Sequence, residues 1–131
     1  MHLIAKYVDN AIELEGNKES LRALSVLLRE VEREVRVALK IPDYPPTPYP
    51  AYVGVLSVDC GGTDVSISRQ HNELRITGPH SKLGILADNI EFLAEQQTSQ
   101  SSVMPHLHIE YNPGHSYLAV HSVPLVVKRS D

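Results

Sequence analysis

The sequence predicts an α+β fold in which two helices lie on one face of a mostly antiparallel sheet. The main reason is an imperfect internal repeat, because residues 10–16 (Asn-Ala-Ile-Glu-Leu-Glu-Gly) align with residues 72–78 (Asn-Glu-Leu-Arg-Ile-Thr-Gly), 62 positions later. The same offset holds at three apolar positions that follow: Leu21 with Leu83, Leu24 with Leu86, and Leu28 with Ile90. We therefore expect an internal duplication of a ββαβ unit within a single domain, residues 1–131, with halves of about 1–60 and 63–131.

Composition and charge narrow the classes of function. The chain has 131 residues, of which 42% are hydrophobic and 21% charged, as is ordinary for a globular protein with its own core. Its formal net charge of −4 argues against nucleic acid and anionic membrane as partners, since both bind basic surfaces. With Cys60 as its one cysteine, the chain cannot form an internal disulfide. It shows no signal sequence and no apolar run of about 20 residues, so we expect a soluble, cytoplasmic protein.

The first hairpin is predicted from alternating residues. Leu3, Ala5 and Tyr7 alternate with more polar neighbours, which is typical of a strand. Asp9-Asn10 indicates a tight turn, because asparagine tolerates a positive φ. A second strand follows, in which apolar and acidic residues point to opposite faces: Ile12 and Leu14 to one, Glu13 and Glu15 to the other.

Residues 18–40 are predicted to form one long helix. An apolar stripe at helical spacing runs along this segment: Leu21, Leu24, Leu27, Leu28, Val31, Val35 and Ala38. Charged residues cover the other side, and Glu32 and Arg36 have the favourable i,i+4 spacing. Pro42 is expected to end the helix. We interpret the mixed charges as a solvated helix face rather than an interface.

A proline- and tyrosine-rich crossover occupies residues 41–52 (Ile-Pro-Asp-Tyr-Pro-Pro-Thr-Pro-Tyr-Pro-Ala-Tyr). Its prolines favour an extended backbone that cannot join a central strand. Residues 53–60 are then expected to form one strand, which Gly61-Gly62 closes.

The second half is expected to repeat the first. Its elements, in order, are a strand with Val65 and Ile67, a turn at His71-Asn72, a strand with Leu74 and Ile76, a helix at residues 80–96, a polar connector at 96–102, a strand with Leu107, Ile109 and Tyr111, and an extended stretch over 117–127. Both helices should cover equivalent strands of one sheet. The opposite face should then be polar, with Glu13, Glu15, Arg75, Thr77, His106, His108 and Glu110.

Histidines and a glutamate give the sharpest local pattern. Strand periodicity places His106, His108 and Glu110 on one face, where two imidazoles and a carboxylate can hold a transition metal. His115 and His121 are near enough in sequence to be added. The alternative, which we favour, is that these residues are polar groups on a solvated sheet face.

Tyrosines mark two candidate surfaces for a protein partner. Tyr44, Tyr49 and Tyr52 lie on the stiff crossover, where rigid amphipathic rings bind at low entropic cost. The alternative is that these rings cover the sheet edge and belong to the core, because tyrosine is often half-buried. The second candidate surface is the proline–glycine turn at residues 112–117, with its residues and neighbours Tyr111, His115 and Tyr117.

The C-terminal run at residues 106–118 (His-Leu-His-Ile-Glu-Tyr-Asn-Pro-Gly-His-Ser-Tyr-Leu), followed by Ser-Val-Pro-Leu-Val-Val at 122–127, resembles a pattern of small bacterial immunity proteins from polymorphic toxin systems. Residues 12–16 and 21–24 are similar to the strand–helix opening of the same family, whereas the crossover and residues 53–70 are left unplaced. The resemblance implies a single-domain α+β protein that binds a cognate toxin and blocks it. It implies no catalytic residue and no cofactor.

Three functions therefore compete. The leading hypothesis is a non-enzymatic binding protein that neutralises a bacterial toxin by occlusion. The second is a metal-binding module or metal-dependent enzyme that uses His106, His108 and Glu110. The third is a structural role as a homodimer or larger assembly, because free sheet edges invite pairing with another copy.

Overall fold

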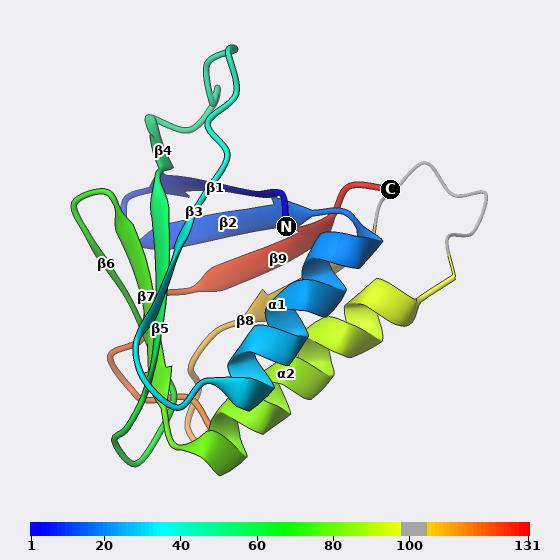
Figure 1. Cartoon of the computed structure of the whole chain (residues 1–131). Helices are drawn as coiled ribbons and strands as arrows, with labels where there is room; N and C mark the ends of the chain where they lie inside the picture. The colour runs from blue at the N-terminus through cyan, green and yellow to red at the C-terminus, as the bar shows by residue number, and fades with distance from the viewer. Residues whose placement is uncertain (98–104) are drawn as a thin grey trace.

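The computed structural model describes residues 1–97 and 105–131, and it confirms the α+β class (Figure 1). Within these residues the elements are β1 (Leu3–Val8), β2 (Ala11–Gly16), α1 (Lys18–Glu30), β3 (Val35–Ala38), β4 (Ala51–Val53), β5 (Val55–Cys60), β6 (Ser66–Gln70), β7 (Glu73–Gly78), α2 (His80–Glu95), β8 (His106–Ile109) and β9 (Leu125–Arg129). Part of the predicted polar connector, residues 98–102, lies outside the described residues. Neither described helix is long and apolar enough to span a membrane.

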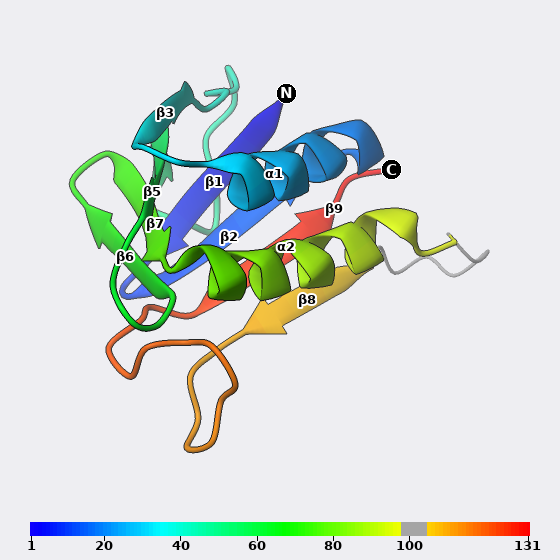
Figure 2. The same cartoon turned by 60° about the horizontal axis from the view of Figure 1, so that its bottom comes forward.

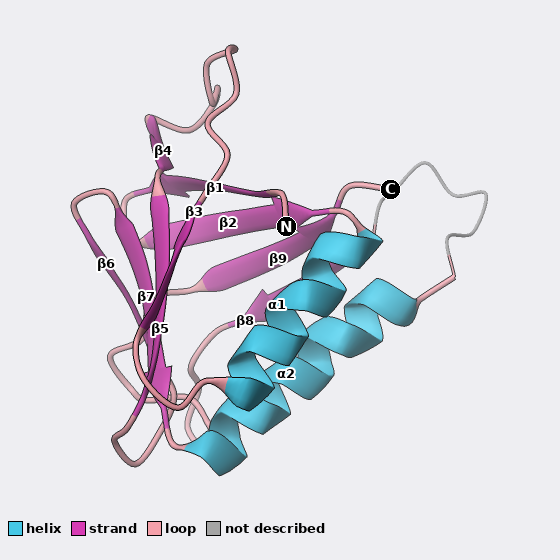
Figure 3. Cartoon of the chain, in the orientation of Figure 1, coloured by secondary structure: helices cyan, strands magenta, loops and turns pink. Residues whose placement is uncertain are grey.

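The strands form two sheets rather than the predicted single sheet, as Figure 3 shows. One sheet has five strands in the order β4-β1-β2-β9-β8, and the other has four in the order β3-β5-β7-β6. The pairs β2–β9 and β5–β7 are parallel, whereas the other five pairs are antiparallel. The prediction of mostly antiparallel pairing is therefore confirmed, but the assignment of all strands to one sheet was wrong.

Both helices lie on the same face of the five-stranded sheet, as predicted. Figure 2 shows α1 and α2 side by side above β1, β2, β9 and β8. The apolar side chains of β2 and β7 point into the core, where Ile12 is 1% exposed and Leu14, Leu74 and Ile76 are fully buried. The alternation of these strands thus decides which face is covered, because burial of each such side chain stabilises the fold by about 1.5–3 kcal/mol.

The predicted polar face is split between the two sheets. Glu13 alternates with the buried residues of β2, and His106 and His108 are exposed on β8, so all three lie on the outer face of the five-stranded sheet. Arg75 and Thr77 alternate with the buried residues of β7, in the other sheet. The expectation that all these side chains share one surface was therefore wrong.

The two aligned segments form the same local structure at the same offset. The turn residues Asp9 and His71 both have a φ of 51°. Strands β2 and β7 each have 6 residues with the same alternation of half-buried and buried side chains. Each sheet, however, combines a hairpin from one half with strands from the other, since β2 pairs with β9 and β7 with β5. The internal duplication itself stays a prediction.

The first helix is much shorter than predicted. It ends at Glu30, and Val31 caps it with its N–H bonded to the Leu27 carbonyl over 3.0 Å. Residues 35–38 instead form β3, which pairs with β5. Val35 fits both the helical and the strand period, and β-branched valines favour the strand once a partner strand is present. Arg36 consequently pairs with Glu73, at 2.5 Å, rather than with Glu32.

The expected strand at residues 53–60 is divided between the sheets. β4 pairs with β1 at the edge of the five-stranded sheet, whereas β5 lies inside the other sheet. Gly54 lies at the passage, where its N–H donates to the Asn72 side-chain oxygen over 2.7 Å. A Cβ at this position would collide with the Asn72 amide. A larger residue where the chain changes sheets would therefore have to displace the Asn72 side chain and its hydrogen bond.

The C-terminal strands are also shorter than predicted. β8 ends at Ile109, so Tyr111 lies outside it, and regular pairing of β9 begins only at Leu125, directly after Pro124. Residues 117–123 instead run along the edge of β6, where the Val65 N–H donates to the Tyr117 carbonyl and the Val123 N–H to the Ile67 carbonyl. This segment covers an otherwise free sheet edge.

Candidate partner-binding surfaces

The crossover at residues 41–52, called the tyrosine segment below, projects beyond the β4 edge of the five-stranded sheet (Figure 1). Tyr44 is its most exposed ring, at 61%. The Tyr52 hydroxyl donates to the Tyr44 carbonyl over 2.8 Å, which ties the two ends of the segment together. Burial raises the pKa of Tyr52, and the neighbouring Tyr44 adds to the rise. The segment thus presents Tyr44 on a held backbone.

Tyr49 folds back over the outer face of the five-stranded sheet. Its hydroxyl donates to Glu13 over 3.2 Å, and the Lys6 ammonium lies 5.5 Å from the ring centroid. Lys6 and Glu13 are themselves 3.6 Å apart. Burial raises the pKa of Tyr49, and the Glu13 carboxylate raises it further. Tyr49 is therefore anchored, whereas Tyr44 is free to meet a partner.

The tyrosine segment and the histidine strand share one face. Strand register places five residues in one row across the outer face of the five-stranded sheet: Tyr52, Lys6, Glu13, Val126 and His108. We call this the outer row. It carries one cation, one anion, an aromatic ring at one end and an imidazole at the other. Such a mixture of side chains is more typical of a surface that binds a protein than of one that binds a nucleic acid.

The described residues bring the two histidines of the predicted metal pattern together without a third ligand. The His106 and His108 rings contact each other edge to face, with centroids 5.0 Å apart, and Glu110 lies beyond the end of β8. No group of three His, Cys, Asp or Glu side chains in residues 1–97 and 105–131 is placed to hold a metal ion. The metal hypothesis therefore gains no support from the geometry.

The second predicted surface is largely structural. Tyr117 is 4% exposed, and its hydroxyl accepts a hydrogen bond from Asn89 over 2.9 Å. His115 Nδ1 accepts from the main-chain N–H groups of Tyr117 and Leu118, at 3.3 and 3.1 Å. Tyr111 packs half-buried against the core. Tyr117 is consequently a core residue, although Tyr111 and His115 keep some exposed area.

The structure does not bring the two predicted surfaces together. Figures 1 and 2 both place the tyrosine segment at one end of the molecule and the turn at residues 112–117 near the other. One partner domain would have to be large to contact both. We therefore treat them as separate candidates.

A cavity of about 340 Å³ lies beside β6 and residues 119–121. In it, Ser66 Oγ and His121 Nε2 are 3.2 Å apart, a pairing that a nucleophilic site also uses. The Asp64 carboxylate, however, binds Lys82 at 2.5 Å rather than the imidazole. The arrangement is a polar hollow and not a serine–histidine–aspartate triad.

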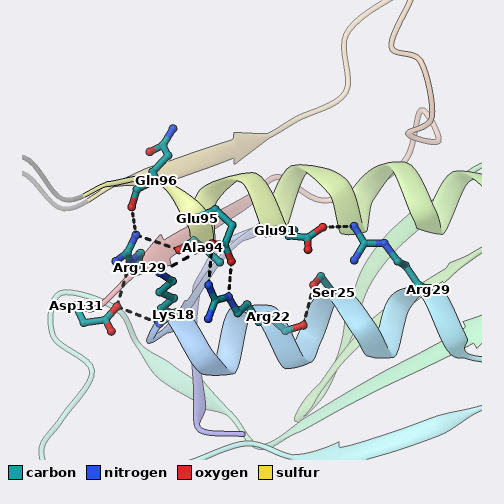
Figure 4. A network of polar contacts seen from close by, with 10 residues as sticks. All are labelled: Lys18, Arg22, Ser25, Arg29, Glu91, Ala94, Glu95, Gln96, Arg129 and Asp131. Carbon is teal, nitrogen blue, oxygen red and sulfur yellow. Dashed lines mark hydrogen bonds and ion pairs between the residues drawn. The ribbon is translucent and has the colours of Figure 1, made fainter.

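A polar network between the helices was not anticipated by the sequence (Figure 4). Arg22 forms hydrogen bonds with Glu95, and Arg29 donates to Asp88 over 2.7 Å and to Glu91 over 2.5 Å. These hydrogen bonds raise the pKa values of both arginines, and the bond from Arg22 lowers the pKa of Glu95. Of the charges interpreted as a solvated face, Arg29 is thus shared with α2. These ion pairs depend on the contact between the two helices, which the local sequence pattern does not encode.

Comparison with known proteins gives one match. The family model described as Immunity protein 32 matches residues 11–36 and 73–130, which is more than half of the chain. No curated protein and no solved structure matches this chain. The matched residues include β2, α1 and everything from β7 to β9, whereas the tyrosine segment falls in the unmatched interval.

Proposed function

The chain belongs to the Immunity protein 32 family, as its resemblance to immunity proteins implied, and we propose that it neutralises a cognate toxin by binding and occluding it. The family match over residues 11–36 and 73–130 is the observation that carries this proposal. Occlusion needs a rigid surface and no reacting group. We expect the two proteins to meet in the cytoplasm, and a homodimer of this chain stays a prediction.

The surface that we propose for the toxin is the tyrosine segment together with the outer row. Tyr44 is exposed while its backbone is held by Tyr52, so that little conformational entropy is lost on binding. Tyrosine is also enriched at the energetic centres of protein interfaces. The segment lies outside the family match, which suits a part that distinguishes one toxin from another.

The proposal is tested by growth protection and by direct binding. A candidate toxin domain, sought among the neighbouring genes, is expressed with and without the chain, and the affinity of the purified pair is measured by calorimetry. The wild-type chain should restore growth. Tyr44→Ala should weaken binding by at least about tenfold, since a central interface tyrosine is worth about 2 kcal/mol or more.

A matched tyrosine variant separates the two candidate surfaces. Tyr111→Ala removes a ring at the other end of the molecule and should leave the affinity unchanged. If Tyr111→Ala weakens binding and Tyr44→Ala leaves the affinity unchanged, the interface lies at the turn at residues 112–117 instead. If the wild-type chain neither protects nor binds, the proposed function is wrong for this toxin.

A further inference from the structure

Every cation of α1 contacts a carboxylate of α2. Lys18 lies 3.9 Å from Glu95, Arg22 is bonded to the same carboxylate, and Arg29 contacts Glu91 (Figure 4). Arg29 also contacts Asp88. These three cations lie along one side of the helix, because residues 18, 22 and 29 share a face at 3.6 residues per turn. The side of α1 that faces α2 is therefore electrically neutralised.

The exposed side of α1, about a quarter turn from these cations, carries two glutamates. Residues at helical spacing form one stripe there: Glu19, Ala23, Val26, Leu27 and Glu30. Both glutamates are exposed, and neither forms an ion pair within the described residues. Glu30 is also the last residue of the helix, where the helix dipole disfavours a carboxylate. Its placement thus costs stability without a compensating ion pair among residues 1–97 and 105–131.

An apolar groove lies on this side of α1. It has a volume of about 320 Å³ and is lined by Met1, Ala23, Val26, Leu27, Glu30, Val31 and Val35. Val26 is 48% exposed and Met1 43%, although both are apolar. Glu19 and Glu30 are 11 residues apart, which places them about 16 Å apart along the helix axis. The groove is therefore an apolar seat with the Glu30 carboxylate in its lining, and Glu19 lies one helical turn before the lining residue Ala23.

We propose that this groove, called the α1 groove, receives an apolar side chain of the toxin that is flanked by lysine or arginine. This inference rests on the proposed function and adds the chemistry of the partner. An apolar side chain would fill the seat at Val26, and cations on either side would meet Glu19 and Glu30. Glu32 and Arg33, in the turn after the helix, add no net charge.

Two observations favour the toxin over a second copy of this chain. A twofold dimer would place the α1 groove against itself, so that its unpaired glutamates would face one another. The groove also adjoins the start of the tyrosine segment. Met1 lines the groove, and two residues later the Leu3 carbonyl accepts the Lys40 N–H over 2.9 Å, just before that segment begins. The groove is thus connected, through the first residues of β1, to the chain that begins the tyrosine segment.

Two variants and two matched controls test the inference with the same purified toxin domain. Val26→Asp places a charge in the seat, and Val120→Asp makes the same change at a valine that is 69% exposed outside the groove. Glu30→Lys reverses a charge of the groove, and Glu110→Lys reverses an exposed one elsewhere. Because all four side chains are exposed, the variants should fold, which circular dichroism and thermal unfolding check.

The kinetics distinguish the roles of the two groove residues. Val26→Asp should raise the dissociation rate at least about tenfold, whereas Glu30→Lys should lower the association rate and weaken its salt dependence. Both controls should match the wild-type chain. If all four variants bind like the wild type, the groove is not the docking site, although the proposed function stands. If the wild type is a dimer that Val26→Asp dissociates, a second copy is the occupant and the inference is overturned.

Discussion

The Arg129 guanidinium donates a hydrogen bond to the Ala94 main-chain carbonyl over 3.2 Å, which joins the last strand to the last turn of α2. Arg129 also donates to the Gln96 carbonyl and, over 3.1 Å, to the Asp131 carboxylate. Asp131 in turn accepts the Lys18 N–H at the start of α1, over 3.0 Å (Figure 4). One buried cation, 6% exposed, therefore holds two helix ends and β9 together. A cation at a helix C-terminus is favoured by the helix dipole.

Replacing Arg129 should destabilise the fold more than any surface charge does. Arg129→Ala leaves buried helix carbonyls without their donor, and we expect a loss of about 3 kcal/mol in the free energy of unfolding. Denaturant unfolding measures this loss. Lys128→Ala is the matched control, because Lys128 lies half-exposed on the other face of β9 and should cost less than about 1 kcal/mol. Equal losses would show that Arg129 is not a structural clamp.

Replacing Ser57 should have the opposite effect and stabilise the fold. Its side chain is fully buried in β5, and its hydroxyl has no hydrogen-bond partner among the described residues. Ser57→Ala should therefore stabilise the chain by about 1 kcal/mol, since an unsatisfied buried hydroxyl is removed. Ser25→Ala is the comparison, because the Ser25 hydroxyl donates to the Arg22 carbonyl over 2.7 Å. Denaturant midpoints should rise for Ser57→Ala more than for Ser25→Ala, and a lower midpoint for Ser57→Ala would contradict the prediction.

Tyr117 should make the fold sensitive to alkaline pH. Burial raises the pKa of its phenol in the folded state, although the hydrogen bond from Asn89 opposes the shift. The stability that the neutral phenol contributes is complete below the unfolded pKa, about 10, and is lost as pH rises through the higher folded value. Tyr117→Phe should cost about 1 kcal/mol at neutral pH, because Asn89 loses its acceptor. This difference should shrink above pH of about 10, and a constant difference across the alkaline range would refute the assignment.

Glu95 should respond at the acid end. The hydrogen bond from Arg22 lowers the pKa of Glu95, so its contribution is present above the unfolded pKa of about 4.3 and is lost as pH falls through the folded value. In Arg22→Ala the Glu95 carboxyl should titrate at a higher pH, which NMR measures directly. Salt should reduce the shift because both side chains are exposed. An unchanged titration midpoint would show that the pair is absent in solution.

Local patterns predicted the elements best where one period dominates. Alternation in residues 10–16 and 72–78 gave the strands and their buried faces, and the apolar stripe of residues 80–96 gave α2 within one residue. Val35 fits both the helical and the strand period, so the local pattern allows the predicted helix to include it. Only its pairing opposite Val58 shows that it belongs to a strand. No glycine or proline marks the end of α1 at Glu30.

The division into two sheets could not be predicted, because strand partners are chosen by contacts between distant residues. Gly54 carries a signal of the change of sheet, yet a lone glycine also marks turns and bulges. The candidate site was predicted in part for the same reason. The rigid tyrosines were visible in the sequence, whereas the burial of Tyr117 and the unpaired glutamates of α1 follow from packing alone.

Neutralisation by occlusion is tested most directly by titrating the purified chain into its toxin domain while the residual toxin activity is measured. The account predicts that toxin activity falls linearly to zero at one chain per toxin molecule. Inhibition should be immediate, and the toxin should be active again when the complex is separated. A slow, complete loss of activity at far less than one chain per toxin would mean that the chain acts as an enzyme, and an unaltered activity would mean that it does not bind this toxin.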